Sequence, residues 1–340
     1  MKGFSIKTEI EEYDTFAEFA NEAGLSAEDL VLCGEHTYDR YIAPLGTGVQ
    51  TLFREKYGTG EPTDAAVDAI IDALRAKKFN RIIAVGGGTV IDIAKAVAVA
   101  GPEDKVDDLY DNVAFLKKYH PLIIVPTTCG TGSEVTNISI INRTRLGVKM
   151  GLTSPEMFAE KAVLIPELLK SLPFKVFATS SIDALVHSVE SSLSPKATDY
   201  SKLFGYKAIE MIITSYQRLV REGKEILPDL MDTFLTASNF AGIAFETAGC
   251  AAVHALSYPL GAKYHVPHGE SNYAVFTGVL KNYMEIKQDG EIATMHEYGV
   301  TEKDAEDFAE SVMKTQGRLM ANNFVVLDYD RVLKIYKELL

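Results

Sequence analysis

The 340-residue chain is short of positive charge and of cysteine, and each shortage excludes a class of function. Lys and Arg total 34 against 47 Asp and Glu, so the formal net charge is −13. A chain this acidic repels phosphate backbones and anionic lipid, so we expect neither a nucleic-acid partner nor a membrane partner. The three cysteines cannot all pair, and none lies in a C-x-x-C spacing. This usage is typical of a reducing compartment.

The sequence also lacks a secretory leader and an uninterrupted apolar run. Its first residues, MKGFSIKTEIEEY, contain neither the apolar stretch nor the small-residue cleavage site of a signal peptide. The most apolar long stretch, residues 240–260, is interrupted by Glu246 and His254, which a membrane span would avoid. We therefore predict a buried core helix over residues 240–260 and a cytoplasmic protein.

The first half of the chain alternates short apolar runs with helical patterns. Strands buried on both faces are predicted at residues 30–33, 81–85 and 121–125. Helices are predicted at residues 64–78 and 90–100, the first of them with Thr63 as its N-cap. This alternation predicts a parallel sheet with crossover helices.

The second half has a different texture. No convincing strand pattern follows Leu164, and long patterns rich in Ala, Ser and Leu take over. The length also favours two domains over one. We predict an α/β domain over residues 1–168 and an all-helical domain over residues 169–340.

A glycine-rich loop joins the predicted strand 81–85 to the next helix. Gly86, Gly87 and Gly88 carry no Cβ, so their backbone N–H groups can approach a phosphate closely. The N-terminus of the helix adds partial positive charge. The loop is not G-x-G-x-x-G, so a tight strand–helix turn that binds nothing stays open as an alternative.

A second polar loop, PTTCGTGSE, follows the strand predicted at residues 121–125. It places the hydroxyl groups of Thr127, Thr128 and Thr131 beside two glycines. Both loops lie at the carboxyl ends of parallel strands, where doubly wound sheets bind ligands, so together they predict a dinucleotide site. The alternative is that Thr131 or Ser133 only caps a helix.

Carboxylates and histidines indicate a metal site in the second half. Asp183 and His187 are four residues apart on a predicted helix and so share a face, although a surface pair has the same spacing. His254, His265 and His268 lie within 15 residues, with His268 in a predicted turn. One carboxylate with several imidazoles suits Zn²⁺ or Fe²⁺. The spacing alone does not say which three histidines ligate.

Four motifs in this order resemble the iron-containing (group III) alcohol dehydrogenase family: GGGTVIDIAK, PTTCGTGSE, DALVH and HALSYPLGAKYHVPHG. The resemblance extends from about residue 28 to the end of the chain. It implies a Rossmann-like dinucleotide-binding domain and an all-helical metal-binding domain, a plan shared with dehydroquinate synthase. It also implies that a cleft between the domains holds NAD(P) and one divalent metal ion.

The resemblance also implies residue roles. Asp183, His187, His254 and His268 match the ligands of an Fe²⁺ or Zn²⁺ ion, whereas His265 matches no ligand position. The residues assigned to the dinucleotide are Gly86, Gly87, Gly88, Thr89, Asp92, Thr127, Thr128, Thr131 and Lys149. The implied reaction is reversible hydride transfer between an alcohol carbon and nicotinamide, with Tyr258 and His268 as catalytic residues.

Three positions depart from the family pattern. Tyr258 stands where many members carry histidine, and it is either an acid–base group or a wall of the substrate pocket. Glu35 follows Cys33 and Gly34 where NAD-preferring members often carry Asp, which favours NAD and leaves NADP open. The segment between Tyr283 and His296 is shorter than in relatives.

Tyr258 and the sequence GESNY after Pro-His-Gly are similar to family members that act on 4-hydroxybutyrate. This similarity implies the pair 4-hydroxybutyrate and succinate semialdehyde, and such a substrate needs a cationic anchor for its carboxylate. Lys263 and His265 are the candidates, with a solvated surface lysine as the alternative for Lys263. The family also implies a homodimer or larger homo-oligomer.

Three other functions compete with this hypothesis. The nearest is another alcohol or diol dehydrogenase of the same family, of the 1,3-propanediol or lactaldehyde type. A cyclase related to dehydroquinate synthase and a nucleotide-binding sensor without catalysis are less well matched. The H-A-L-S-Y-P-L-G segment fits the cyclase poorly, and the intact ligand set argues against the sensor.

Overall fold

The computed structural model describes residues 3–264, 266–284 and 295–340, which form two compact units. The α/β unit comprises Ile6–Pro173 and Gln217–Asn239. The helical unit comprises Phe174–Tyr216 and Phe240–Leu340, together with the N-terminal residues up to Ser5. The predicted domain boundary between residues 168 and 169 stays a prediction.

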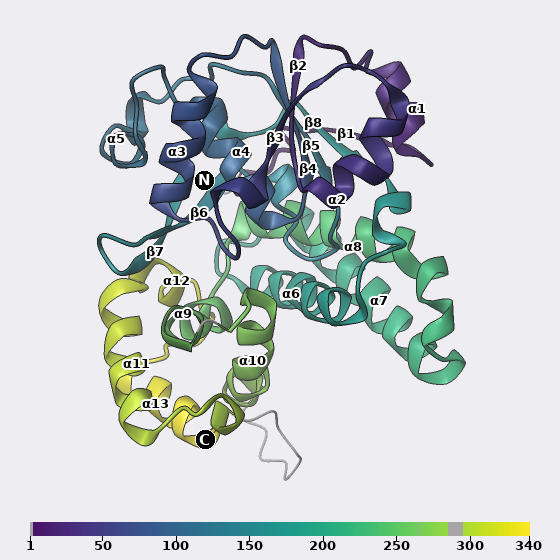
Figure 1. The fold of residues 1–340 in the computed structure, drawn as a ribbon. Helices are drawn as coiled ribbons and strands as arrows, with labels where there is room; N and C mark the ends of the chain where they lie inside the picture. Colours follow the sequence, from purple (N-terminus) through teal and green to yellow (C-terminus); the bar gives the residue numbers. More distant parts are fainter. Residues whose placement is uncertain (1–2, 265, 285–294) are drawn as a thin grey trace. The chain divides into compact units, whose positions relative to one another are not determined.

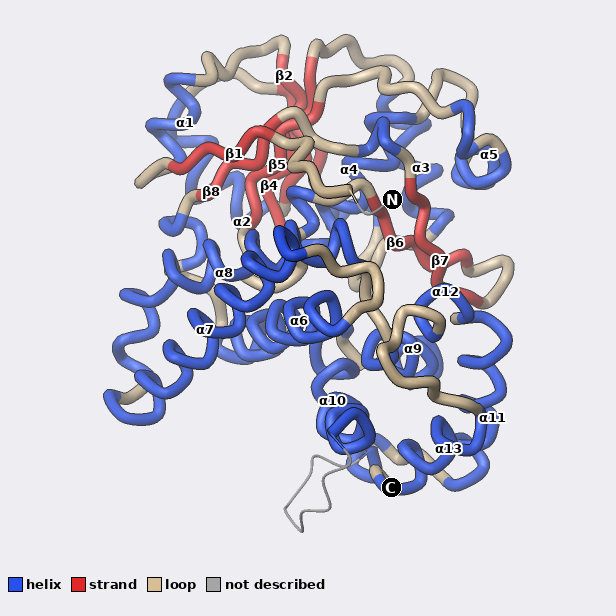
Figure 2. The backbone as a smooth tube through the Cα atoms, turned by 180° about the vertical axis from the view of Figure 1, so that it is seen from behind, coloured by secondary structure: helices blue, strands red, loops and turns tan. Residues whose placement is uncertain are grey.

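The α/β unit contains a parallel sheet of six strands in the order β1-β8-β5-β4-β2-β3, with a separate antiparallel hairpin, β6-β7 (Figure 2). The strands are β1 (Glu9–Glu12), β2 (Asp29–Cys33), β3 (Gln50–Phe53), β4 (Arg81–Gly86), β5 (Leu122–Pro126), β6 (Ile138–Arg143), β7 (Val148–Thr153) and β8 (Lys161–Leu164). The central strands β2, β4 and β5 are almost wholly buried, so their continuous apolar runs identified them correctly.

Five α-helices belong wholly to the α/β unit: α1 (Phe16–Glu22), α2 (Glu35–Thr37), α3 (Asp64–Leu74), α4 (Gly88–Val99) and α5 (Val106–Asp111). Figures 1 and 2 show α1 and α3 on opposite sides of the parallel sheet, as in a doubly wound fold. The predicted N-cap is confirmed, because the Thr63 side chain accepts a hydrogen bond from Ala66 N. The predicted α/β class with a parallel sheet is therefore confirmed.

The sequence patterns did not reveal the edge strands or the hairpin. β1 (EIEE) and β3 (QTLF) are short and carry polar residues, because each pairs on one side only. β6 alternates buried and half-buried residues, and β7 is largely exposed, so neither resembles the buried core strands. Their pairing with each other, rather than a continuous apolar run, makes them strands.

The second half is helical, and none of its described residues after Leu164 forms a strand, as predicted. Its helices are α6 (Phe174–Leu193), α7 (Asp199–Glu222), α8 (Leu227–Ala248), α9 (Ala252–Tyr264), α10 (His268–Met284), α11 (Glu302–Thr315), α12 (Gly317–Met320) and α13 (Tyr329–Glu338). Tyr336 of α13 is fully buried, and its hydroxyl donates to Leu256 O of α9 at 2.7 Å. This contact joins the C-terminal helix to the helix that carries His254.

The prediction of one continuous core helix over residues 240–260 was wrong. α8 ends at Ala248 and α9 begins at Ala252, and the chain direction bends by 104° between the two helices. Gly249 occupies the break with a backbone φ of +76°, which residues that carry a Cβ rarely adopt. Asn322 stabilises the break, because its Nδ2 donates to Ala248 O at 2.6 Å and to Cys250 O at 3.0 Å.

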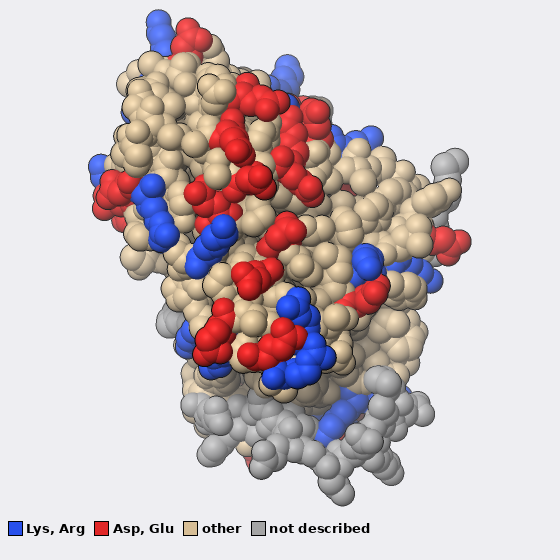
Figure 3. All heavy atoms as spheres, turned by 90° about the vertical axis from the view of Figure 1, so that its right-hand side faces the viewer, with Lys and Arg blue, Asp and Glu red and all other residues tan. Residues whose placement is uncertain are grey.

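Within the described residues, no single helix has the length and apolar content needed to cross a membrane. The bent pair that meets at Gly249 passes that test only when its two helices are taken together. Acidic side chains gather on one face of the molecule (Figure 3), in keeping with the net charge of −13.

Candidate metal centre and dinucleotide loops

Four predicted ligands converge within the helical unit. Asp183 and His187 lie on α6, His254 lies on α9, and His268 is the first residue of α10. Asp183 Oδ1 is 4.0 Å from the Nε2 atom of His187, 3.6 Å from that of His254 and 3.7 Å from that of His268. The turn that we predicted around His268 is a helix start. The structure thus brings all four side chains to one carboxylate oxygen.

The cluster is closed on one side and open on the other. The side chains of Asp183, His187 and His254 are at most 7% exposed, whereas that of His268 is 34% exposed. The Tyr258 ring lies on this side, with its centroid 6.2 Å from that of the His268 ring. Of the four candidate ligands, His268 is thus the most accessible to solvent, and Tyr258 lies beside it.

Glu190 supports the cluster from α6. It accepts hydrogen bonds from His254 Nδ1 at 2.7 Å, from Ala251 N at 2.9 Å and from Val253 N. Because Nδ1 is engaged by a carboxylate, the other nitrogen of His254 is directed at Asp183. A carboxylate behind a histidine commonly orients the ring and raises its basicity as a ligand.

Asn272 lies at the centre of the cluster, four residues after His268 on α10. Its Nδ2 donates to Asp183 Oδ1 at 2.7 Å and lies 3.3 Å from His254 Nε2 and 3.4 Å from His268 Nε2. Its buried Oδ1 has no hydrogen-bond partner among the described residues. Acceptor atoms that converge in this way, with a buried oxygen left over, suit a cation.

The close approach of α10 to α6 depends on Gly269. A Cβ at this position would lie 2.2 Å from Thr179 O on α6. Such a contact is impossible without moving the backbone, so any larger residue would push His268 away from Asp183. This explains why glycine directly follows the ligand histidine.

Cys250 is an additional neighbour that the motif analysis did not place in the cluster. One ligand atom each of His187, Cys250 and His254 lie within 4.8 Å of one another. Burial raises the pKa of the thiol, but His254 and His187 outweigh this effect and bring the pKa down to about 7. Cys250 lies in the loop after Gly249 and precedes His254 by four residues, the same spacing as Asp183 and His187, so this spacing was an available signal.

The electrostatics of the cluster favour a bound cation. Burial by itself would raise the pKa of Asp183, but His187 and the other imidazoles hold it well below its usual range. The carboxylate therefore stays ionised in a buried setting, where its attraction for positive charge is strong. Burial opposes protonation of His187, yet Asp183 raises the pKa of that ring above its ordinary value.

Of the two predicted substrate anchors, Lys263 is already paired with an acidic residue of the protein. The Lys263 ammonium makes an ion pair with Asp304 of α11, whose other oxygen accepts from the Tyr264 hydroxyl at 2.7 Å. His265 lies outside the described residues, as does most of the segment between Tyr283 and His296.

Burial raises the pKa of Tyr258 to about 12, so its phenol holds its proton near neutral pH.

In the α/β unit, the two polar loops lie side by side. Gly86 ends β4 and pairs in register with Pro126 of β5, and Thr127 N donates to Gly86 O at 3.0 Å. A Cβ on Gly87 would lie 3.1 Å from Thr128 Cγ2, and one on Gly88 would lie 2.9 Å from Thr131 Cγ2. The glycines thus leave the N-terminus of α4 open beside the threonine hydroxyls, a suitable place for a diphosphate.

Three other residues assigned to the dinucleotide have partners within the protein. Asp92 accepts from Ser133 Oγ at 3.2 Å and from Ile140 N at 3.1 Å, which connects α4 to the second loop and to β6. Thr89 Oγ1 donates to Gly60 O at 3.4 Å, and the Lys149 ammonium pairs with Glu61. These contacts organise the site, and direct contact of the three residues with a cofactor stays a prediction.

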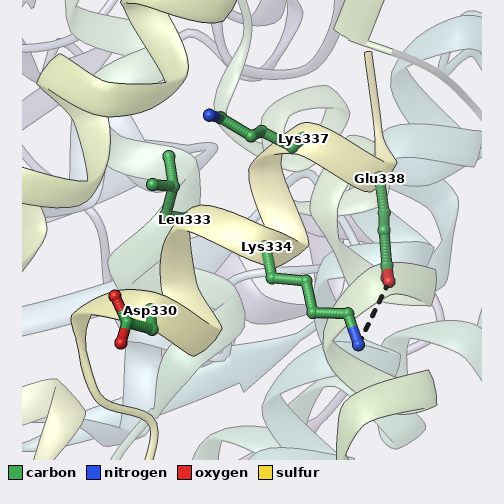
Figure 4. Close-up of a pocket in the computed structure, with 5 residues that line it drawn as sticks. All are labelled: Asp330, Leu333, Lys334, Lys337 and Glu338. Carbon is green, nitrogen blue, oxygen red and sulfur yellow. Dashed lines mark ion pairs between the residues drawn. The ribbon is translucent and has the colours of Figure 1, made fainter.

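A pocket of the helical unit runs along α13 (Figure 4). It is lined by Asp330, Leu333, Lys334, Lys337 and Glu338. Figure 4 shows the ion pair in which Lys334 Nζ lies 3.6 Å from Glu338 Oε1. Its two acidic and two basic side chains stand on exposed turns of one helix and balance in charge. The pocket therefore offers fewer groups for metal binding or catalysis than the histidine cluster.

Glu190 and Asn272 could have been found from helical spacing. Glu190 follows Asp183 by seven residues and His187 by three, so all three share one face of α6. Asn272 follows His268 by four residues on α10. A polar residue one turn away from a ligand on the same face was the available signal.

Comparison with known proteins identifies the family of this chain. Residues 8–166 match the family described as iron-containing alcohol dehydrogenase, and residues 177–294 match the Fe-containing alcohol dehydrogenase family, C-terminal. The chain is 40% identical over 371 aligned residues to the 4-hydroxybutyrate dehydrogenase of Clostridium kluyveri, with 100% of both chains covered.

Solved structures share the fold. An iron-containing alcohol dehydrogenase from Thermotoga maritima aligns with a TM-score of 0.83 at 25% identity, covering 100% of this chain and 99% of that chain. The sulfoacetaldehyde reductase of Bifidobacterium kashiwanohense, solved in complex with NAD⁺, aligns with a TM-score of 0.84 at 22% identity, covering 100% and 98%. The chain therefore belongs to the iron-containing alcohol dehydrogenase family and is a metal-dependent oxidoreductase of alcohols.

Proposed function

We propose that this enzyme interconverts 4-hydroxybutyrate and succinate semialdehyde, using NAD(H) and one divalent iron or zinc ion. The observation that carries the proposal is the convergence of Asp183, His187, His254 and His268 within the helical unit. The 40% identity to a 4-hydroxybutyrate dehydrogenase over the full length of both chains supports this substrate pair.

The donor set fits the metal that the family implies. Ligand atoms that are about 2.1 Å from an ion lie roughly 3.4 Å apart in a tetrahedral site. The three Nε2 atoms lie 3.6–4.0 Å from Asp183 Oδ1, so only small shifts would be needed. Three imidazoles with one carboxylate suit Fe²⁺ as well as Zn²⁺. Asp183, His187, His254 and His268 would hold the ion.

When bound, a divalent ion acts as a Lewis acid toward the alcohol or carbonyl oxygen. The protein's own groups set the conditions for this chemistry. Glu190 keeps His254 in one orientation, and Asn272 does the same for the Asp183 carboxylate. Tyr258 stands at the open side beside His268, where its phenol can hydrogen-bond the substrate oxygen and its ring can exclude water. We propose this role for Tyr258 in preference to that of a general base, because its pKa is raised.

We propose NAD(H) rather than NADP(H) as the cofactor. Glu35 follows the end of β2, and its backbone N–H donates to Glu55 Oε2 at 3.4 Å. The Glu55 carboxylate thus lies beside the backbone of Glu35, at the end of the strand where dinucleotide-binding folds recognise the ribose 2′ position. Glu35 and Glu55 would accept hydrogen bonds from a 2′-hydroxyl and repel a 2′-phosphate. Glu55 comes from the segment after β3, so the proximity is tertiary.

The test is a dehydrogenase assay on metal-stripped protein re-supplied with Fe²⁺ or Zn²⁺. The substrate panel includes 4-hydroxybutyrate, 1,3-propanediol, lactaldehyde and simple alcohols, each with NAD⁺ and NADP⁺. We expect the highest kcat/KM with 4-hydroxybutyrate and NAD⁺. A preference for an uncharged diol would reject the substrate proposal, and the absence of net NADH formation would favour a cyclase.

We also propose that the enzyme is a homodimer or larger homo-oligomer, as the family implies. Sedimentation equilibrium of the metal-loaded enzyme tests this directly, because a mass of 37.3 kDa would show a monomer.

A further inference from the structure

The proposed ligand set leaves out the thiol of Cys250. This side chain is half-buried in the helical unit, whereas Cys33 and Cys129 are buried in the α/β unit. One ligand atom each of His187, Cys250 and His254 lie within 4.8 Å of one another. A tetrahedral zinc ion would place a sulfur ligand roughly 3.6 Å from each nitrogen ligand. The three side chains would therefore have to close by at most about 1.2 Å to share an ion.

The backbone on both sides of the thiol is held by hydrogen bonds. Cys250 O accepts from Asn322 Nδ2 at 3.0 Å, and the next residue, Ala251, donates its N–H to Glu190 at 2.9 Å. Glu190 also accepts from His254 Nδ1 at 2.7 Å, so one carboxylate fixes the loop of Cys250 and the His254 ring together. The position of the thiol beside the imidazole is thus set by contacts of the folded chain.

The His187 ring lies in a stack of rings. Its centroid is 4.4 Å from that of the Phe245 ring and 4.6 Å from that of the His254 ring. Phe245 belongs to the last turn of α8, five residues before Cys250. The bend after α8 therefore places the thiol beside an imidazole whose orientation α8 itself supports.

Among the described residues, the candidate ligands form two groups that share His254. Asp183, His254 and His268 offer one carboxylate and two imidazoles, a set typical of non-haem Fe²⁺. His187, Cys250 and His254 offer one thiol and two imidazoles, and a soft thiolate with imidazoles suits Zn²⁺. Asp183 Oδ1 is 4.0 Å from His187 Nε2 and 3.6 Å from His254 Nε2, so its charge attracts an ion in either group.

We propose that Cys250 is a zinc ligand, so that the enzyme binds Zn²⁺ through His187, Cys250 and His254 and binds Fe²⁺ without the thiol. The thiol proton passes to solvent as the zinc–sulfur bond forms. Three protein ligands leave a fourth position open, as in catalytic zinc sites. The inference rests on the metal centre of the proposed function and names the residue that would distinguish the two metals.

The test is X-ray absorption spectroscopy of the metal-stripped enzyme re-supplied with Zn²⁺ or, in the absence of oxygen, with Fe²⁺. A sulfur ligand scatters at about 2.3 Å from zinc, whereas nitrogen and oxygen ligands scatter at about 2.0–2.2 Å. Wild type is compared with Cys250→Ser, which keeps the shape of the side chain but not the sulfur. The matched control, Cys33→Ala, removes a cysteine of the α/β unit. Chelator competition measures the affinity for each metal, and circular dichroism verifies folding.

We expect a sulfur ligand around zinc in wild type and in Cys33→Ala, but neither around zinc in Cys250→Ser nor around iron. Cys250→Ser should lower zinc affinity by about a hundredfold or more, because even a residue that only orients a ligand contributes tenfold to a hundredfold. Its iron affinity should be unchanged. His268→Ala should show the reverse, a larger fall in iron affinity than in zinc affinity.

Each contrary result would overturn the inference: zinc in wild type without a sulfur ligand, a sulfur ligand that persists in Cys250→Ser, a sulfur ligand around iron, or an equal fall in both affinities. Should Cys250→Ser fail to fold, the spectra of zinc-loaded and iron-loaded wild type decide the matter.

These readouts use no substrate, so they separate this inference from the proposed function. A zinc–sulfur bond in an enzyme that does not oxidise 4-hydroxybutyrate would refute the substrate proposal and leave Cys250 as a zinc ligand. An enzyme that oxidises 4-hydroxybutyrate while its zinc has only nitrogen and oxygen ligands would refute the role of Cys250 alone.

Discussion

The dinucleotide loops of the α/β unit and the histidine cluster of the helical unit are built from different parts of the chain. The loops offer backbone N–H groups and hydroxyls from two segments that follow neighbouring strands. The cluster uses side chains from three helices, and Glu190 is 64 residues away in sequence from the histidine it supports. A site made of backbone should tolerate the loss of one side chain but not the gain of a Cβ on its glycines, whereas the cluster should not tolerate the loss of a ligand side chain.

The largest effect is expected from the carboxylate that all three imidazoles share. Asp183→Asn removes the charge that attracts the cation, so we expect loss of bound metal and a fall in kcat/KM on the order of a thousandfold. Metal analysis and steady-state assays measure the two effects. NADH binding, followed by fluorescence, should be unchanged, and a variant that kept its metal and activity would remove Asp183 from the ligand set.

A smaller effect on the same cluster is expected from Glu190→Gln. The amide has a similar shape but no charge, so it holds His254 less firmly, and we expect metal affinity to fall between about tenfold and a hundredfold. Competition with a chelator measures this affinity. Glu190→Asp, which keeps the charge on a shorter side chain, should recover part of it. Unchanged metal affinity in Glu190→Gln would show that the contact with His254 is only structural.

The converse prediction concerns the loop. Gly87→Ala adds a Cβ 3.1 Å from Thr128 Cγ2 and blocks the approach of a phosphate to the start of α4. We expect the KM for NAD⁺ to rise about tenfold or more, because at least one hydrogen bond to a charged group would be lost. Metal content should stay at the wild-type level. If the variant lost metal but bound NADH normally, the proposal that the loop binds the dinucleotide and the cluster binds the metal would be wrong.

The smallest effect is expected at Asp304, on the periphery of the helical unit. Hydrogen bonds from Lys263, Thr301 and Tyr264 hold the pKa of its carboxyl well below the usual range. Because the folded pKa lies below the unfolded one, Asp304 stabilises the fold fully above about pH 4 and loses this contribution as the pH falls further. Asp304→Asn should lower the free energy of unfolding at pH 7, and the difference from wild type should shrink on acidification.

Denaturant titrations at pH 7 and pH 3 measure this difference. For Lys263→Ala we expect only a small loss in the free energy of unfolding at pH 7, since the Lys263 side chain is 50% exposed and an exposed ion pair is screened by water. A pH-independent difference between Asp304→Asn and wild type would show that its hydrogen bonds, and not its charge, matter.

Local patterns in the sequence were enough for much of the fold and part of the site. The buried strands β2, β4 and β5 could be identified because a strand covered on both faces is continuously apolar. Gly86, Gly87 and Gly88 could be proposed as a phosphate site because the absence of a Cβ is a property of each residue and lets a ligand approach the backbone. Asp183 and His187 could be paired because one turn of helix separates them.

The remaining features depended on tertiary contacts. The helix break at Gly249 escaped prediction because Asn322, more than seventy residues later, stabilises it. The Lys263 ammonium is paired by Asp304, which comes from another helix, so its sequence neighbours do not reveal that pairing. Sequence patterns report which groups share a strand, loop or helix face, but the pairing of charges between distant segments depends on how the folded helices pack.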